Sequence, residues 1–98
     1  MPYEVEDCTG TQRRGTVIDY FFPVSNGQTS RTIAVGITDQ AIHPTGQAAR
    51  TAEVLMPAAR AWVKHNLARG FDPAGQTPLP ILDAMLLDHW VAYGEFPG

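Results

Sequence analysis

Three histidines are the first residues in this sequence to test for chemistry. They are His43, His65 and His89, and histidine is the side chain most often used as a general base or metal ligand near neutral pH. His43 precedes a proline, and His65 follows Lys64 on the polar side of an expected helix. Neither has a supporting partner nearby, so a solvated surface position is the better interpretation of both.

His89 has carboxylates close to it in the sequence. Asp88 or Asp83 could supply a second metal ligand, but adjacent helix positions point about 100° apart, so Asp88 and His89 do not converge on one ion. His89 also stands beside Trp90 on an apolar stripe. We therefore interpret it as a partly buried, hydrogen-bonded core residue.

Cys8 is the remaining candidate nucleophile. It follows Glu6 and Asp7, whose negative charges disfavour a thiolate. The sequence also lacks a glycine-rich phosphate loop, a Gly-x-Ser-x-Gly elbow and paired cysteines. We predict no catalytic, cofactor-binding or metal-binding residue and no cofactor, and an enzyme ranks third among the functions considered.

The basic residues raise the alternative of nucleic-acid binding. Arg13, Arg14 and Arg31 could place positive charge along a hairpin, and Arg60 and Lys64 stand four residues apart on one helical face. Seven Lys and Arg stand against ten Asp and Glu, however, for a net charge of -3. Without a basic surplus, nucleic acid ranks second as a partner, after a second copy of the chain or another protein.

Length and composition indicate one small folded domain over residues 1–98. A chain of 98 residues with 44% hydrophobic and 17% charged residues has room for one core and none of the character of a disordered segment. A single cysteine fits a reducing compartment. No basic leader or apolar run of about 18 residues occurs, so we expect a cytoplasmic protein without a membrane partner.

Residues 1–37 have the patterns of β-strands. Residues 3–7 alternate apolar and acidic side chains and predict a short edge strand, 9–12 read as a polar loop, and 15–24 are rich in β-branched and aromatic residues. Asn26-Gly27 favours a two-residue hairpin turn. The predicted cross-strand pairs are Ser25 with Gln28, Phe22 with Arg31, Tyr20 with Ile33, and Ile18 with Val35.

This register sorts the hairpin into two faces. The expected core face holds Ile18, Tyr20, Ile33, Val35 and Ile37. Phe21, Asp19 and Thr32 fall on the opposite face. Because helices are expected on one side only, Phe21 with Asp19 and Thr32 is our candidate interaction surface.

Residues 38–94 have helical patterns. A single turn is expected over 38–42, ended by His43-Pro44. Apolar residues recur every three or four positions over 47–69, and Gly70 predicts the helix end. Pro57 either kinks one helix, which we favour, or begins a second one. A last helix is expected from Pro80 to Gly94, followed by a loosely held tail over 95–98.

The last helix carries a broad apolar stripe. Its expected members are Ile81, Leu82, Met85, Leu86, His89, Trp90 and Tyr93. The fold class predicted from all these patterns is α+β, with a small antiparallel sheet packed against two amphipathic helices. The function predicted first is a noncatalytic protein-interaction module or homodimer, with a nucleic-acid-binding protein as the alternative.

Overall fold

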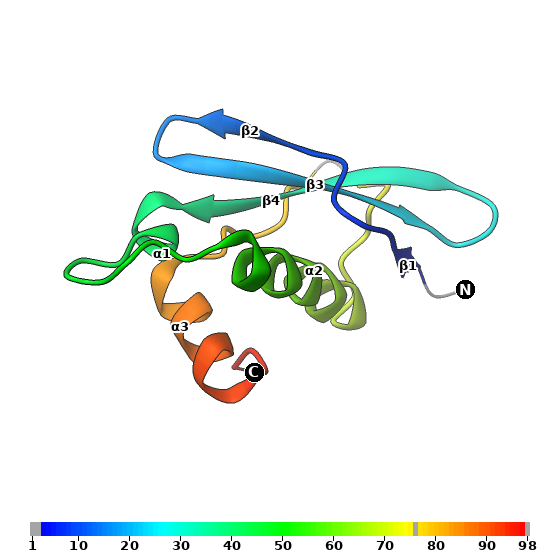
Figure 1. Ribbon diagram of the computed structural model, residues 1–98. Coiled ribbons are helices and arrows are strands. Elements are labelled where there is room, and N and C mark those ends of the chain that lie inside the picture. The colour runs from blue at the N-terminus through cyan, green and yellow to red at the C-terminus, as the bar shows by residue number, and fades with distance from the viewer. Residues whose placement is uncertain (1–2, 76, 98) are drawn as a thin grey trace.

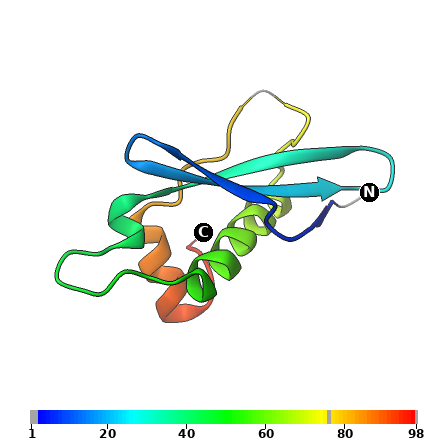
Figure 2. The same ribbon diagram turned by 45° about the horizontal axis from the view of Figure 1, so that its top comes forward.

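The protein is an antiparallel sheet with helices packed against one of its faces. The computed structural model describes residues 3–75 and 77–97. In this part of the chain, the helices lie on one side of the sheet and the other side carries none (Figures 1 and 2). The α+β prediction is confirmed. The elements are β1 (Glu4–Val5), β2 (Gly10–Arg14), β3 (Val17–Ser25), β4 (Ser30–Thr38), α1 (Asp39–Ile42), α2 (Ala52–Ala68) and α3 (Ala84–Tyr93).

The central strand of the sheet is β3. On one side it pairs with β4, and on the other with β1 and β2 in succession. The Glu6 amide donates to the Pro23 carbonyl and the Thr9 amide to the Phe21 carbonyl, both at 2.9 Å. Asp7 and Cys8, between these two bonds, are extra residues that bulge out of the ladder. The predicted N-terminal edge strand is therefore present at 4–5, and a bulge separates it from a second segment.

Strand β2 corrects the prediction of a loop at 9–12. Its residues are all exposed, so the segment has no alternation of buried and exposed side chains for a sequence pattern to reveal. Pairing with the edge of β3 makes it a strand, with Arg14 opposite Val17. The turn between them is Gly15-Thr16, where Gly15 has a φ of 65°, so β3 begins at Val17 and not at Gly15.

The β3–β4 hairpin has a longer loop than predicted. Ser25 pairs with Ser30, Phe22 with Ile33, and Val24 with Arg31. The Asn26 side-chain oxygen accepts hydrogen bonds from the amides of Gln28 at 3.0 Å and Thr29 at 2.9 Å, so it closes a four-residue loop over 26–29.

The register error of two residues leaves the two faces of the hairpin unchanged. Side chains on a strand alternate with a period of two, so a two-residue shift keeps each one on its predicted face. The core face is buried as predicted, except that Ile18 is half-buried. The buried members are Tyr20, Ile33, Val35 and Ile37.

Helices α1 and α2 follow β4 in the chain. The Thr38 hydroxyl caps α1 by accepting from the Ala41 amide at 3.2 Å, which confirms the expected single turn. Helix α2 begins after Thr51, later than predicted, and continues through Pro57, so the alternative of a helix that starts at Pro57 is wrong. It ends before Gly70, where φ is 96°. No helix in residues 3–75 and 77–97 is long and apolar enough to cross a membrane.

Helix α3 begins at Ala84, not at Pro80. The Leu82 amide donates to the Gly36 carbonyl at 2.8 Å, which holds the preceding segment extended beside β4. The Asp83 carboxylate then accepts from the Leu86 amide at 2.9 Å and caps the helix. Leu82 is fully buried at this edge of the core.

The C-terminal tail is tied to the core, unlike the loosely held segment expected from the sequence. Phe96 is only 8% exposed, and its ring meets Trp62 edge-on with 4.8 Å between centroids. The Trp62 indole also donates to the Pro80 carbonyl at 2.8 Å. Trp62 thus joins α2 to the α2–α3 connection and to the tail, while Gly98 lies outside the described residues.

Candidate functional site

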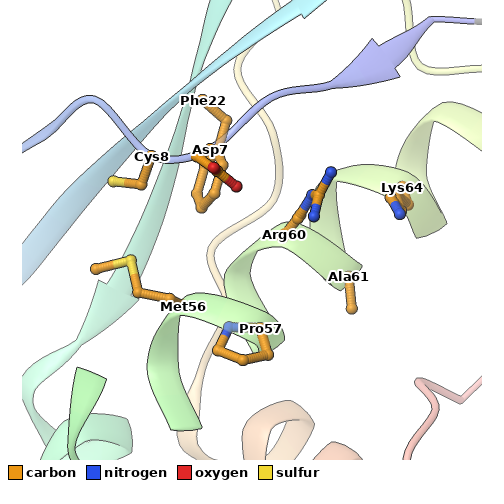
Figure 3. Close-up of a pocket in the computed structure, with 8 residues that line it drawn as sticks. All are labelled: Asp7, Cys8, Phe22, Met56, Pro57, Arg60, Ala61 and Lys64. Atoms are coloured by element: carbon orange, nitrogen blue, oxygen red, sulfur yellow. The ribbon is translucent and has the colours of Figure 1, made fainter. Parts of the chain in front are cut away.

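A groove separates the N-terminal edge strand from α2 (Figure 3). Its first part is a cavity of about 500 Å³, within the size range of small-molecule sites. The bulged residues Asp7 and Cys8 form one wall. Met56 and Ala61 of α2 form the other, with the ring of Phe22 between them. The β-bulge therefore forms part of the wall of this cavity.

A second cavity continues the groove along α2. Its volume is about 690 Å³, and its apolar walls include Tyr3, Leu67 and Phe71. Arg60 and Lys64 line both cavities. Because they stand one helical turn apart, they place two cations at the junction of the two cavities.

Arg60 is the best-anchored polar side chain of the groove. One guanidinium nitrogen, Nη2, donates to the Val5 carbonyl at 2.7 Å. Its Nε is buried and has no hydrogen-bond partner among the described residues. A buried charged donor without an acceptor is costly, but this nitrogen is sealed from solvent, so a ligand in the groove could reach it only if the Arg60 side chain moved.

A second feature is the exposed side of α3. Met85 is 80% exposed and Tyr93 71%. With successive residues about 100° apart, Tyr93 projects about 80° to one side of Met85 and Val91 about 120° to the other, with Asp88 and Ala92 between Met85 and Val91. Ile81, which precedes the helix in the chain, is 43% exposed, and Val91 is 49% exposed. We call Ile81, Met85, Val91 and Tyr93 the α3 surface.

The α3 surface revises the predicted apolar stripe of the last helix. Leu82 and Leu87 are buried, and Leu86 and Trp90 are half-buried. Met85 and Tyr93, predicted on the same stripe, instead face outward. Because α3 is apolar nearly all around, its sequence could not tell which side packs inward.

The predicted interaction surface lies on the helix-free face of the sheet. Phe21 is half-exposed, opposite Gly10 and Ala34 on the neighbouring strands. Thr32 is exposed, but Asp19 is buried. Arg14 donates two hydrogen bonds to the Asp19 carboxylate, at 3.0 and 3.2 Å. These hydrogen bonds, together with the negative charge of Asp19, raise the pKa of Arg14. Phe21 and Thr32 are thus the accessible members of this surface.

The three arginines of the nucleic-acid alternative do not gather in one place. Arg14 pairs with Val17 and Arg31 with Val24, at positions seven residues apart on β3, which corresponds to about 23 Å. Arg13 forms an ion pair with Asp39 at 3.0 Å. Two of the three cations are therefore already paired, and the third lies near the other end of the hairpin.

The three histidines also lie apart. His43 is exposed after α1. His65, expected on a solvated surface, is half-buried and stacks on Trp62 with 5.5 Å between centroids. His89 is half-buried and its Nδ1 donates to the Glu95 carbonyl at 2.9 Å. Within the described residues, no group of three or more His, Cys, Asp and Glu is placed to hold a metal ion.

Sequence reasoning identified Arg60 and Lys64 as a cationic pair but did not place them in a groove. The groove depends on the bulge at Asp7 and Cys8, which arises from pairing with β3 and has no local sequence signal. No family model, curated protein or solved structure matches this chain.

Proposed function

We propose that this chain is a noncatalytic protein-interaction module that pairs with a second copy through the α3 surface. The observation that carries the proposal is the exposure of Met85 and Tyr93 on a helix that is apolar nearly all around. Such helices are normally buried. Covering Met85 alone would stabilise a complex by up to about 2 kcal/mol.

The charge of α3 favours a second copy as the partner. Asp88 is the one Asp, Glu, Lys or Arg in Ala84–Tyr93, and Arg50 forms an ion pair with it. Arg50 also donates to the Ala41 carbonyl at 2.9 Å, which holds it in place. An apolar surface with its one charge paired can face its own copy across a two-fold axis without like-charge repulsion.

Size-exclusion chromatography with light scattering tests this proposal. We expect the native chain to show twice its 10.7 kDa mass and Met85→Glu to show a folded monomer, because the added carboxylate would be buried unpaired. Met85 lies in the first turn of α3, where glutamate is compatible with the helix dipole. Gln47→Glu adds the same charge at an exposed loop position and should remain dimeric.

A Phe21→Asp variant separates the α3 surface from the helix-free sheet face. If α3 forms the interface, this variant stays dimeric. A native chain that is monomeric at every concentration, or a dimer that Phe21→Asp breaks and Met85→Glu does not, would refute the proposal. The cytoplasmic location expected from the single cysteine stays a prediction.

A further inference from the structure

We infer that the groove between α2 and the N-terminal edge strand binds a small amphipathic carboxylate, with an apolar body and one negatively charged end. This inference is independent of the pairing through α3. It starts from the junction of the two cavities, where Arg60 and Lys64 are the basic residues.

The polar end of the ligand is assigned by the donors at the junction. Arg60 and Lys64 line both cavities, and none of the ion pairs found among the described residues involves Lys64. A carboxylate oxygen placed against both side chains would accept charge-assisted hydrogen bonds. The bond from Arg60 to Val5 holds the guanidinium in position before a ligand arrives, which lowers the entropic cost of binding.

The apolar end is assigned by the cavity walls. Phe22, Met56 and Ala61 line the first cavity, and Leu67 and Phe71 line the second. An alkyl or aryl group extending from the junction into either cavity would be removed from water. The binding site therefore joins two cations to apolar walls, the combination that fits an amphipathic anion.

The acidic neighbours favour a singly charged ligand over a phosphate. Asp7 lines the first cavity and Glu4 the second, and neither forms an ion pair with Arg60 or Lys64. Their repulsion grows with the charge of the ligand. A dianion would therefore be repelled more strongly than a carboxylate.

The edge strand also argues against an added peptide strand in the groove. A peptide that extends the sheet needs free carbonyl acceptors along the edge. The Val5 carbonyl already accepts from Arg60, and Asp7 and Cys8 interrupt the ladder. The groove is therefore better suited to a small molecule.

The test is a two-dimensional nitrogen–proton NMR titration of the native chain with octanoate, octyl phosphate and octanol. We expect octanoate to shift the amide signals of residues lining the groove, and to bind more tightly than either other probe. Signals of α3 should respond less than those of α2. Met85→Glu should bind octanoate like the native chain, so a failure of the proposed pairing would not disturb this result.

Two variants examine the polar and apolar ends separately. Lys64→Met keeps most of the apolar stem and should weaken octanoate binding about five-fold, whereas Arg31→Met, at an exposed site on β4, should not. Ala61→Phe should fill the first cavity and weaken binding in a chain that remains folded.

Three outcomes would overturn the inference. The first is that millimolar octanoate shifts no amide signals, or shifts signals centred outside the groove. The second is that octanol or octyl phosphate binds at least as tightly as octanoate. The third is that Lys64→Met and Arg31→Met change octanoate binding by the same amount.

Discussion

Tyr20 shows how one residue couples the core to pH. Its side chain is buried on the inner face of β3, and burial raises its pKa from the ordinary value of 10.0, with a smaller contribution from the charge of Cys8. The raised pKa means that the folded state holds the phenol proton more tightly than the unfolded state. The resulting stabilisation is fully present below about pH 10 and is lost as pH rises through the folded-state pKa.

Tyr20→Phe should therefore reduce the alkaline loss of stability. Above about pH 10, the free energy of unfolding of the native chain should fall more steeply than that of the variant, because phenylalanine has no proton to lose. Denaturant unfolding at several pH values measures this difference. Below about pH 9, where the phenol keeps its proton in both states, the difference between the two chains should stay constant, which serves as the control. Parallel curves for Tyr20→Phe and the native chain would contradict the prediction.

At the scale of elements, Gly36 allows three strands to pack closely on the helix-free face of the sheet. A Cβ added there would lie 2.9 Å from Val17 Cγ1 and 3.2 Å from Asp19 Oδ1, and 3.5 Å from Arg14 Nη2. Glycine is thus needed at this position for space. The ion pair between Arg14 of β2 and Asp19 of β3 lies beside Gly36, in the space that a larger side chain would fill.

Gly36→Ala should lower the free energy of unfolding by about 1–3 kcal/mol, because overpacking forces the neighbours of the new methyl group to move. Chemical denaturation measures the loss. The matched control is Gly10→Ala on β2, where an added Cβ meets nothing within 4 Å and the change should stay within about 0.5 kcal/mol. Equal effects of the two substitutions would show that space at Gly36 is not limiting.

At the scale of the whole molecule, the C-terminal tail closes the core between α2 and α3. The Phe96 ring lies 4.8 Å from Trp62, 5.6 Å from His65 and 6.4 Å from Trp90, measured between centroids. A chain of this length has only a small margin of stability. One aromatic side chain at such a junction therefore carries a large share of it.

Phe96→Ala should destabilise the protein by about 3 kcal/mol through lost burial and the cavity left behind. The midpoint of denaturant unfolding measures this cost. Glu95→Ala changes the exposed neighbouring side chain and leaves in place the carbonyl that His89 contacts, so it should have almost no effect. An unchanged midpoint for Phe96→Ala would mean that the tail does not seal the core in solution.

Local patterns were sufficient where a single segment carries the signal. The alternation of side chains over β3 and β4 placed Tyr20 and Val35 on the core face even though the register was wrong, because a shift of two residues conserves the face. Gly70 predicted the end of α2 in the same way, since a left-handed backbone after a helix favours glycine. The sequence by itself thus determined the class of the fold and the inner face of its hairpin.

Only the tertiary structure decided the features that depend on two segments meeting. Strand β2 exists because the edge of β3 pairs with it, and the bulge at Asp7 and Cys8 opens the groove beside Arg60. Contact with the rest of the core selects the buried side of α3 and leaves Met85 outside. Strand pairing and side-chain packing join residues that are far apart in the chain, so the periodicity of a single segment cannot predict these contacts.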